Sequence, residues 1–484
     1  MPHQNNFHLQ DLIREKFSKA MSNMYKAEVP LYEDLLNIVN QINEELINAP
    51  EIQNESISDL SRINLERHGA IRLGTHEELH QISRLFNVMA MKPVGYYDLS
   101  IADLPVHSTV FRPITRESLA ANPFRVFCSV LRLELLDQEL RIKTEQTLEQ
   151  RQIINDKCIE LIDKFEKDNG LNEDDSNSFV NEAVKTFKWH EEAQVSRSFY
   201  KELLSVNSLL ADIVSFKGPH INHLTPRVLD IDLLYERMSE QGIKMTDTIQ
   251  GPPRRKVPIL LRQTSFRALS ENVSFKEEDS NESKGSHRAR FGEIEKRGAA
   301  LTPKGFDLYK QILEKVLSQV NQADKNYKNI LEQEFKEFPD TSLSLFQKKL
   351  AYFDFELNES KIDKLDIESK AKISNIINEF PLDKLAYAQD ETHQNLLKLI
   401  EADLLTLKFL NYEDFLPVSA AGIFKSNIVE GGFTKASEQT LSSKEDLEQS
   451  LSQSIYDPLK LYEEESNKSL LKALKNLDKL SNND

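Results

Sequence analysis

Two stretches of this chain follow one order of elements, and this repeat constrains the fold more than any other feature. The first runs strand, helix and three strands, at 66–73, 75–89, 94–99, 108–113 and 124–135. The second follows the same order at 219–225, 230–241, 243–249, 257–266 and 288–295. A repeated strand–helix–three-strand unit indicates a duplicated module. We therefore expect an α+β core built from two βαβββ modules.

Histidines and glutamates occupy matching places in the two modules. His68 precedes Glu134 by 66 residues, and His223 precedes Glu293 by 70 residues. In each module the histidine lies on the opening strand, and the glutamate is predicted on a strand near the end. The order of the elements supports the duplication more strongly than residue identity does.

The opening strand of the first module carries a histidine and an arginine on one face. His68 and Arg72 are four residues apart, so on a strand they point the same way, with Ala70 between them. An imidazole can bind a metal, and a guanidinium can bind a substrate carboxylate through two parallel hydrogen bonds. The alternative is a surface strand with a solvated arginine.

The second module offers two choices of histidine and two of glutamate. His220 and His223 are separated by an odd number of residues, so on a strand only one of them points inward. Glu293 and Glu295 share a face, in line with Phe291. Each motif has a structural alternative, namely a satisfied structural histidine or a solvated carboxylate pair. Two histidines and one glutamate from separate strands form the facial triad that holds Fe(II) and leaves one side open.

Composition excludes several classes of function. The formal net charge is -17 and the pI is near 5.3, which disfavours nucleic-acid binding, and the longest basic run is only Arg254–Lys256. The sequence has no apolar run long enough to span a membrane and no secretory signal at its start. Cys128 and Cys158 are the only cysteines, so we expect a cytoplasmic protein without a disulfide framework or thiolate metal site.

The rest of the chain is predicted to be mostly helical and to surround the core. Apolar side chains recur at helical spacing in 9–26, 31–48, 136–205 and 303–410, whereas 412–424 is apolar and rich in small residues. These patterns predict a helical lead-in (1–60), the first module (61–135), a helical insertion (136–210) and the second module (211–300). Another helical insertion (301–410), a pocket-lining segment (411–435) and a helical tail (436–484) follow.

Several short stretches of the sequence carry a family resemblance. They are Asn64-Leu-Glu-Arg-His-Gly-Ala-Ile-Arg72, Val94-Gly-Tyr-Tyr-Asp-Leu99, Val106-His-Ser-Thr109, Asn122-Pro-Phe-Arg-Val-Phe127, His220-Ile-Asn-His-Leu-Thr-Pro-Arg227, Pro258-Ile-Leu-Leu-Arg-Gln-Thr-Ser-Phe266, Arg290-Phe-Gly-Glu-Ile-Glu295 and Asp414-Phe-Leu-Pro-Val-Ser-Ala-Ala-Gly-Ile-Phe424. Through them the chain resembles the 2-oxoadipate dioxygenase/decarboxylases, also described as hydroxyglutarate synthases, of the vicinal oxygen chelate superfamily. The resemblance implies a β-barrel core of that superfamily, wrapped by large helical insertions.

The resemblance also implies a set of site residues. The metal ligands would be His68, His223 and Glu293, with His220 and Glu295 as fallback ligands. Glu293 is preferred because Phe291-Gly-Glu-Ile-Glu-Lys-Arg297 is similar to the Phe-x-Glu-Ile-Ile-Gln-Arg strand of the hydroxyphenylpyruvate dioxygenases, whose first glutamate is the ligand. By the same resemblance, Arg72 would hold the distal carboxylate of the substrate, and Val418 and Ser419 would line the substrate pocket.

The activity implied by the resemblance is an Fe(II)-dependent conversion of 2-oxoadipate and O2 to 2-hydroxyglutarate and CO2, in lysine breakdown. The partners would be a small 2-oxo dicarboxylate and O2, with no nucleic acid, no membrane and no obligate protein partner. Two alternatives remain open. One is a non-redox metal-dependent isomerase or lyase of the same superfamily, because the ligand types do not exclude Zn(II), Ni(II) or Mn(II). The other is a helical interaction protein without catalytic activity.

Overall fold

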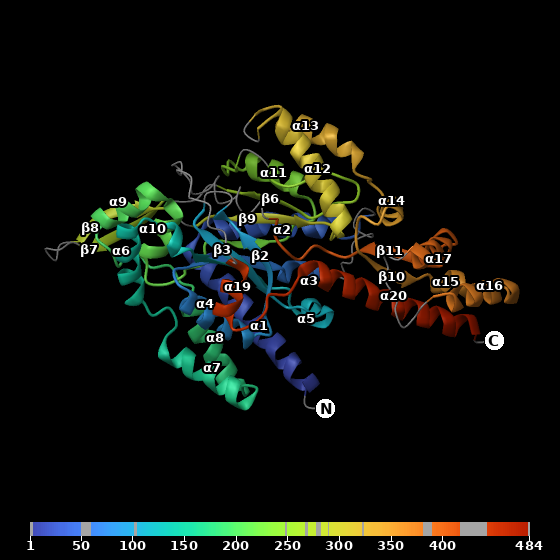
Figure 1. Cartoon of the computed structure of the whole chain (residues 1–484), viewed down its shortest axis with the longest axis horizontal. Helices are drawn as coiled ribbons and strands as arrows, with labels where there is room; N and C mark the ends of the chain where they lie inside the picture. Colours follow the sequence, from blue (N-terminus) through green and yellow to red (C-terminus); the bar gives the residue numbers. More distant parts are fainter. Residues whose placement is uncertain are drawn as a thin grey trace.

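A five-stranded mixed sheet in the order β2-β3-β4-β1-β5 lies at the centre of the molecule, and helices surround it (Figure 1). The fold comes from a computed structural model, and it confirms the predicted α+β class. The residues that the structure describes are 3–49, 60–100, 104–246, 249–266, 270–276, 282–288, 290–321, 324–380, 390–416 and 443–482.

The first module has the predicted order of elements. It consists of β1 (Arg67–Leu73), α4 (His76–Asn87), β2 (Lys92–Asp98), β3 (Val106–Arg112), the short helix α5 (Arg116–Ala121) and β4 (Arg125–Leu131). Strand β1 is parallel to β4, with His68 opposite Arg125, and β3 is antiparallel to β2 and β4. Helix α4 begins after Thr75, whose hydroxyl accepts a hydrogen bond from the backbone N–H of Glu78 at 3.1 Å.

The second module repeats this topology with shorter strands. Its elements are β5 (Leu224–Pro226), α11 (Ile231–Glu240), β6 (Leu261–Ser265) and β9 (Glu293–Arg297). Arg227, directly after β5, forms a parallel bridge with Glu295 of β9. Strand β9 is antiparallel to β6, and residues 245 and 250 bridge antiparallel to the segment around β6. The first module has the same arrangement, in which β1 is parallel to β4, β4 is antiparallel to β3, and β3 is antiparallel to β2. The second module therefore follows the same topology, with isolated bridges in place of its second strand.

The two modules are joined through their opening strands. Strand β5 is antiparallel to β1, with Thr225 opposite His68. The predicted strand 219–225 is reduced to Leu224–Pro226, since prolines at 219 and 226 limit the ladder of hydrogen bonds. The pairing nevertheless brings the end of the 218–223 segment next to the strand that carries His68.

Three predictions about strands are wrong. The predicted strand 243–249 is not a strand among its described residues, of which only Met245 makes a bridge. Glu134 does not lie on a strand, because β4 ends at Leu131 and Glu134 follows in the 3-10 turn Leu133–Leu135, ion-paired with Arg132 at 2.7 Å. The predicted strand 288–295 begins only at Glu293 and continues to Arg297, and an antiparallel hairpin that was not predicted, β7 (Glu271–Lys276) and β8 (Glu282–His287), lies between β6 and β9. The hairpin is rich in charged and small polar residues, and its only apolar alternation is Val273 and Phe275, which is too short to predict a strand.

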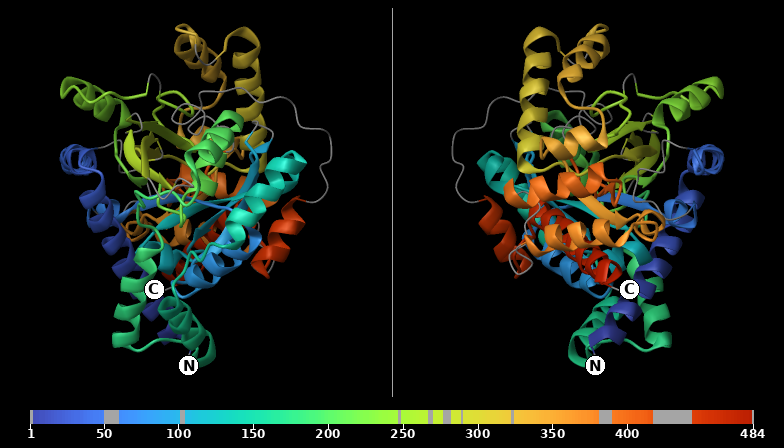
Figure 2. Two further views of the ribbon diagram at one scale, coloured as in Figure 1. Left: turned by 90° about the vertical axis from the view of Figure 1, so that its left-hand side faces the viewer. Right: turned by 90° about the vertical axis from the view of Figure 1, so that its right-hand side faces the viewer.

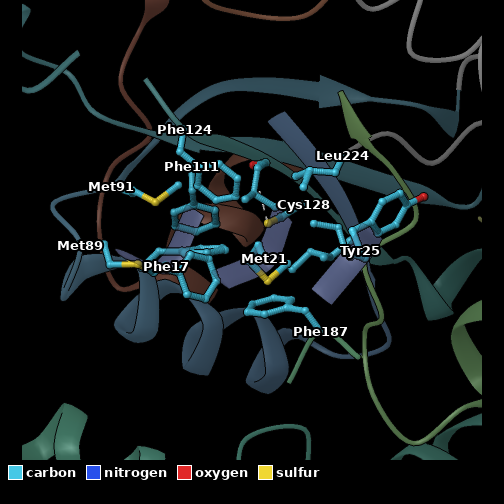
Figure 3. Packing of buried hydrophobic residues seen from close by; sticks show 14 of the residues in the cluster. Phe17, Met21, Tyr25, Met89, Met91, Phe111, Phe124, Cys128, Phe187 and Leu224 are labelled. Atoms are coloured by element: carbon cyan, nitrogen blue, oxygen red, sulfur yellow. Dashed lines mark hydrogen bonds between the residues drawn. The ribbon is translucent and has the colours of Figure 1, made fainter. Parts of the chain in front are cut away.

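The N-terminal helices are part of the main core. Helices α1 (His3–Glu28) and α2 (Leu31–Leu46) pack beside the sheet, and Phe17, Met21 and Tyr25 of α1 point into a cluster with Phe124 and other sheet residues (Figure 3). Cys128 is buried in the same cluster, and burial raises the pKa of its thiol well above the usual value. A buried thiol of this kind is a packing residue.

The segment after the first module is helical, as its periodicity predicts. It contains α6 to α10, which lie at one side and the lower edge of the molecule in Figure 1. Their bounds are Gln138–Glu149, Asp156–Asp168, Glu173–Lys185, Arg197–Val206 and Ser208–Ser215. Helix α10 is the most enclosed of them, since all of its residues from Leu209 to Ser215 are buried.

The C-terminal third is less purely helical than predicted. Its helices α12 to α17 are accompanied by two strands, β10 (Phe353–Leu357) and β11 (Leu405–Phe409), which form an antiparallel pair. The helices have the bounds Pro303–Gln319, Tyr327–Glu334, Ser342–Gln347, Glu359–Ile362, Ile367–Asn378 and Asp390–Glu401. Each strand has five residues, which is too short to stand out against the helical pattern around it.

The last two helices are packed rather than loose. Helix α19 (Ser443–Leu451) lies against α4, and α20 (Pro458–Asn482) lies against β10 and α16, along one side of the molecule (Figures 1 and 2). Leu470, Leu474 and Leu477 of α20 are fully buried. Within the described residues, no helix combines the length and apolar character needed to cross a membrane.

The packing of α1 gives a test of the core. Phe17 is buried against the rings of Phe124 and Phe187, with centroid distances of 5.8 and 5.7 Å. Phe17→Ala should lower the free energy of unfolding by about 3–5 kcal/mol because it leaves a cavity between these rings. Denaturant unfolding should show this as a lower midpoint. Leu12→Ala is the control on the same helix, because Leu12 is 44% exposed and its loss should cost under about 0.5 kcal/mol. Equal midpoints for the two variants would contradict the packing.

Candidate metal centre

Three side chains from separate segments converge at the junction of the modules. His68 lies on β1, His223 immediately precedes β5, and Glu293 is the first residue of β9. One ligand atom from each lies within 4.8 Å of the others, and all three residues are buried. The structure therefore brings together the three residues that the resemblance implies as ligands, while their role in metal binding stays a prediction.

Backbone contacts fix the segments that carry these residues. The backbone N–H of Asn222 donates to the carbonyl of Ala70 at 2.9 Å, and that of Phe291 donates to the carbonyl of Asn222 at 3.1 Å. Gly69 permits this approach, because a Cβ at that position would lie 2.4 Å from Cδ1 of Ile221. The three segments are thus joined within two residues of each candidate ligand.

The N-terminal helix braces the same junction. The hydroxyl of Tyr25 on α1 lies 3.0 Å from the carbonyl oxygen of Asn222 and 2.7 Å from that of Phe291, and it donates to these oxygens. Tyr25 is fully buried, and burial raises the pKa of its phenol well above the usual value, so the hydroxyl keeps its proton. The segments next to His223 and Glu293 are therefore held by a residue from the first helix.

The donor set fits a divalent metal ion. Oε1 of Glu293 lies 2.8 Å from Nε2 of His68 and accepts hydrogen bonds from Thr225 and Gln263 at 3.1 Å each. Burial lowers the pKa of His223 to about 4, so its imidazole is neutral near pH 7, as a metal ligand must be. Burial raises the pKa of Glu293, but the two neighbouring histidines outweigh this and lower it. Two imidazoles and one carboxylate then face one another in a buried site.

Glu295 lies on the other side of His68 from Glu293. Its Oε2 is 3.2 Å from Nδ1 of His68, and its carboxylate accepts hydrogen bonds from Arg125 at 2.6 and 2.9 Å and from Arg297 at 2.8 Å. Burial raises the pKa of Glu295, but Arg125, His68 and Arg297 hold it well below the usual value. Glu295, the fallback ligand, is therefore a charged carboxylate behind His68, and it is not in the candidate metal group.

His220, the other fallback residue, also lies outside the metal group. Its Nε2 is 3.2 Å from Oδ1 of Asp212, while His223 faces Glu293. The odd spacing predicts that only one of the two histidines points inward, but both are buried, and they contact different carboxylates. The backbone at both residues is irregular, because β5 begins only at Leu224.

Arg72 is buried in the same part of the core. Its Nη1 is paired with Asp212, and its positive charge helps to lower the pKa of His223, so it lies within electrostatic reach of the metal group. The sequence provided no reason to single out Asp212, which lies on α10, the last helix of the block from α6 to α10. Binding of a substrate by Arg72 stays a prediction.

The proposed pocket segment reaches the candidate centre. The ring of Phe415 lies 4.8 Å from that of His68 and 4.6 Å from the guanidinium of Arg125, measured to ring centroids. Val418 and Ser419, the predicted pocket residues, fall outside the described residues.

The chain is similar to proteins of one known family in sequence and in structure. The family model described as 2-oxoadipate dioxygenase/decarboxylase matches residues 17–427. Curated relatives with that description include proteins of Pseudomonas putida, 44% identical over 96% of this chain and 97% of the relative, and of Escherichia coli, 43% identical over 95% and 97%. The crystal structure of the hydroxyglutarate synthase from Pseudomonas putida in complex with 2-oxoadipate has a TM-score of 0.82 and 42% identity, covering 97% of this chain and 98% of that one.

The carboxylate behind His68 gives a test of the centre. Glu295→Gln should weaken binding of Co(II) to the metal-free protein roughly 10- to 100-fold, because groups that orient a metal-bound histidine commonly contribute that much. Glu293→Ala should reduce binding further, since it removes a proposed ligand. Competition with a chelator, followed by the visible absorption of Co(II), measures both affinities.

A surface carboxylate provides the control for this test. Glu139→Gln should bind Co(II) like the unmodified chain, because the side chain of Glu139 is 81% exposed and pairs with Lys143. The assignment fails if Glu295→Gln binds Co(II) as tightly as the control variant does.

Proposed function

The chain belongs to the 2-oxoadipate dioxygenase/decarboxylase family, and we propose that it converts 2-oxoadipate and O2 to 2-hydroxyglutarate and CO2. The observation that carries the proposal is the convergence of His68, His223 and Glu293 in a chain that matches the family over nearly its whole length. The reaction balances, since the two products together contain all six carbon atoms of the substrate and both atoms of O2.

Fe(II) is the proposed metal, held by His68, His223 and Glu293. Two histidines and one carboxylate form the facial triad of non-haem iron oxygenases, which leaves positions open on one side of the ion. When bound, Fe(II) supplies the coordination positions for the 2-oxo acid and O2 and the redox chemistry that activates O2. The same donor atoms suit other divalent ions, so the choice of Fe(II) depends on the proposed oxygenase activity.

The chain's own residues have three tasks in this proposal. The buried histidines and Glu293 hold three metal positions and keep bulk water away. Glu295 fixes the ring of His68 through Nδ1. Arg72, four residues from His68 on β1, binds the distal carboxylate, so the two ends of a 2-oxo dicarboxylate are held by different groups on one strand. Val418 and Ser419 complete the pocket, with Ser419 providing a hydrogen bond.

The non-redox isomerase or lyase is the competing proposal for the same metal group. The purified chain should be freed of metal, titrated with Fe(II) without oxygen and then assayed in an oxygen electrode with a panel of 2-oxo acids. The proposed function requires O2 uptake with 2-oxoadipate and release of one CO2 for each O2 consumed. Metal binding without O2 uptake for any 2-oxo acid would favour the non-redox enzyme.

Arg72 gives a separate test of substrate recognition. Arg72→Ala should raise KM for 2-oxoadipate roughly 10- to 100-fold, because a charge-assisted hydrogen bond to a carboxylate is lost. Fe(II) affinity should change little, since Arg72 is not a proposed ligand. Arg84→Ala is the control, because Arg84 is a surface arginine paired with Asp163 and Glu166. An unchanged KM for the Arg72 variant would show that another group binds the carboxylate.

A further inference from the structure

A buried polar cluster surrounds Asp212 beside the candidate metal centre. Oδ1 of Asp212 lies 2.9 Å from Nε2 of His287 and 3.2 Å from Nε2 of His220, and Oδ2 accepts a hydrogen bond from Nη1 of Arg72. The aspartate is only 3% exposed, and its partners come from β1, the 218–223 segment and β8. One carboxylate on a helix of the insertion therefore connects three parts of the core.

Two further residues extend the cluster. Asn222 fits best with its amide oxygen toward Arg72, accepting from Nη1 at 2.9 Å and from Nε2 of His220 at 3.3 Å. The hydroxyl of Tyr200 on α9 lies 2.9 Å from Nδ1 of His287. Since Asn222 is next to His223 in the chain, the cluster borders the proposed ligands.

The charge of Asp212 is maintained by its neighbours. Burial raises the pKa of Asp212, but His220 and Arg72 outweigh this effect and hold the pKa well below its usual value. A buried ion pair is weak evidence for stability, because apolar residues of similar volume often stabilise a core equally well. Arg72 of this pair lies on the strand that carries His68. Recognition of a charged substrate explains this position better than stability does.

From this geometry we propose that Asp212 positions the guanidinium of Arg72 to receive the distal carboxylate of the substrate. The inference depends on the proposed function, because it assumes that a 2-oxo dicarboxylate binds here. Both Asp212 and Asn222 engage Nη1, so they anchor one end of the guanidinium plane. A guanidinium binds a carboxylate best when its planar fork has a fixed direction. The helical insertion thus contributes to substrate selection through α10.

A different role for Asp212 predicts the opposite result. If its carboxylate only competed with the substrate for Arg72, removing it would lower KM for a dicarboxylate. If Asp212 fixes the orientation of Arg72, removing it raises KM for a dicarboxylate and leaves a monocarboxylate unaffected. The direction of the change in KM therefore separates positioning from competition.

The test compares Asp212→Ala and Asp212→Asn with the unmodified Fe(II)-loaded chain. The substrates are 2-oxoadipate and 2-oxohexanoate, which has the same carbon chain without the distal carboxylate. For Asp212→Ala, KM for 2-oxoadipate should rise about 10-fold or more, whereas KM for 2-oxohexanoate and both kcat values should stay within about 3-fold. Asp212→Asn keeps the volume and one acceptor oxygen, so it should show a smaller rise in the same direction.

Fluorescence provides a readout that does not depend on turnover. Trp189 is the only tryptophan of the chain, and its ring lies 4.7 Å from that of His220 and 6.3 Å from that of His287. Its emission should therefore report adipate, a dicarboxylate without the keto group, entering the cluster. The Kd for adipate should rise about 10-fold in Asp212→Ala, in parallel with KM for 2-oxoadipate.

Asp354→Asn is the matched control, because Asp354 is also 3% exposed and paired with an arginine, Arg116, but lies on β10. Its KM for 2-oxoadipate should not change. A lower KM for 2-oxoadipate, an equal change for both acids or no change in the Asp212 variants would overturn the inference. Failure of the proposed function would be recognised separately, since the unmodified chain would then consume no O2 with 2-oxoadipate.

Discussion

The imidazole of His68 is enclosed between two buried carboxylates, and much of the core serves to make this arrangement possible. Glu293 lies 2.8 Å from one ring nitrogen and Glu295 lies 3.2 Å from the other. Buried charges are costly unless they are paired, and Arg125 and Arg297 pair with Glu295. Arg125 lies on β4 directly opposite His68, and both glutamates lie on β9. The pairing of the strands therefore places the charged residues next to their partners.

Local patterns in the sequence predict the first module well. Strand β1, helix α4 and the Thr75 cap follow from alternation, helical spacing and capping chemistry, which depend on neighbouring residues. The choice of His223 and Glu293 over His220 and Glu295 needed the family resemblance. Spacing alone could not decide between them, because irregular backbone before β5 changes which face each histidine occupies.

Contacts between distant segments account for what the sequence did not reveal. Asp212 lies in a short helix whose residues from Leu209 to Ser215 are all buried, and its pairing with Arg72 of β1 is a contact between distant segments. Arg125 is within a recognised motif, but its pairing with Glu295 joins β4 to β9 across 170 residues of sequence. The hairpin β7–β8 offers only Val273 and Phe275 as an alternating apolar pair, which is too short to predict a strand, although His287 at its end reaches Asp212.

The contact made by Tyr25 has a consequence for how the protein matures. Its hydroxyl is separated along the chain by 197 residues from Asn222 and by 266 residues from Phe291. During synthesis, helix α1 leaves the ribosome long before either carbonyl exists, and chains grow at only about 5–20 residues per second. Helix α1 must therefore be exposed until Phe291 has been translated, because only then can Tyr25 contact the segments next to His223 and Glu293. The three candidate ligands can therefore come together only late in synthesis, when both modules have been translated.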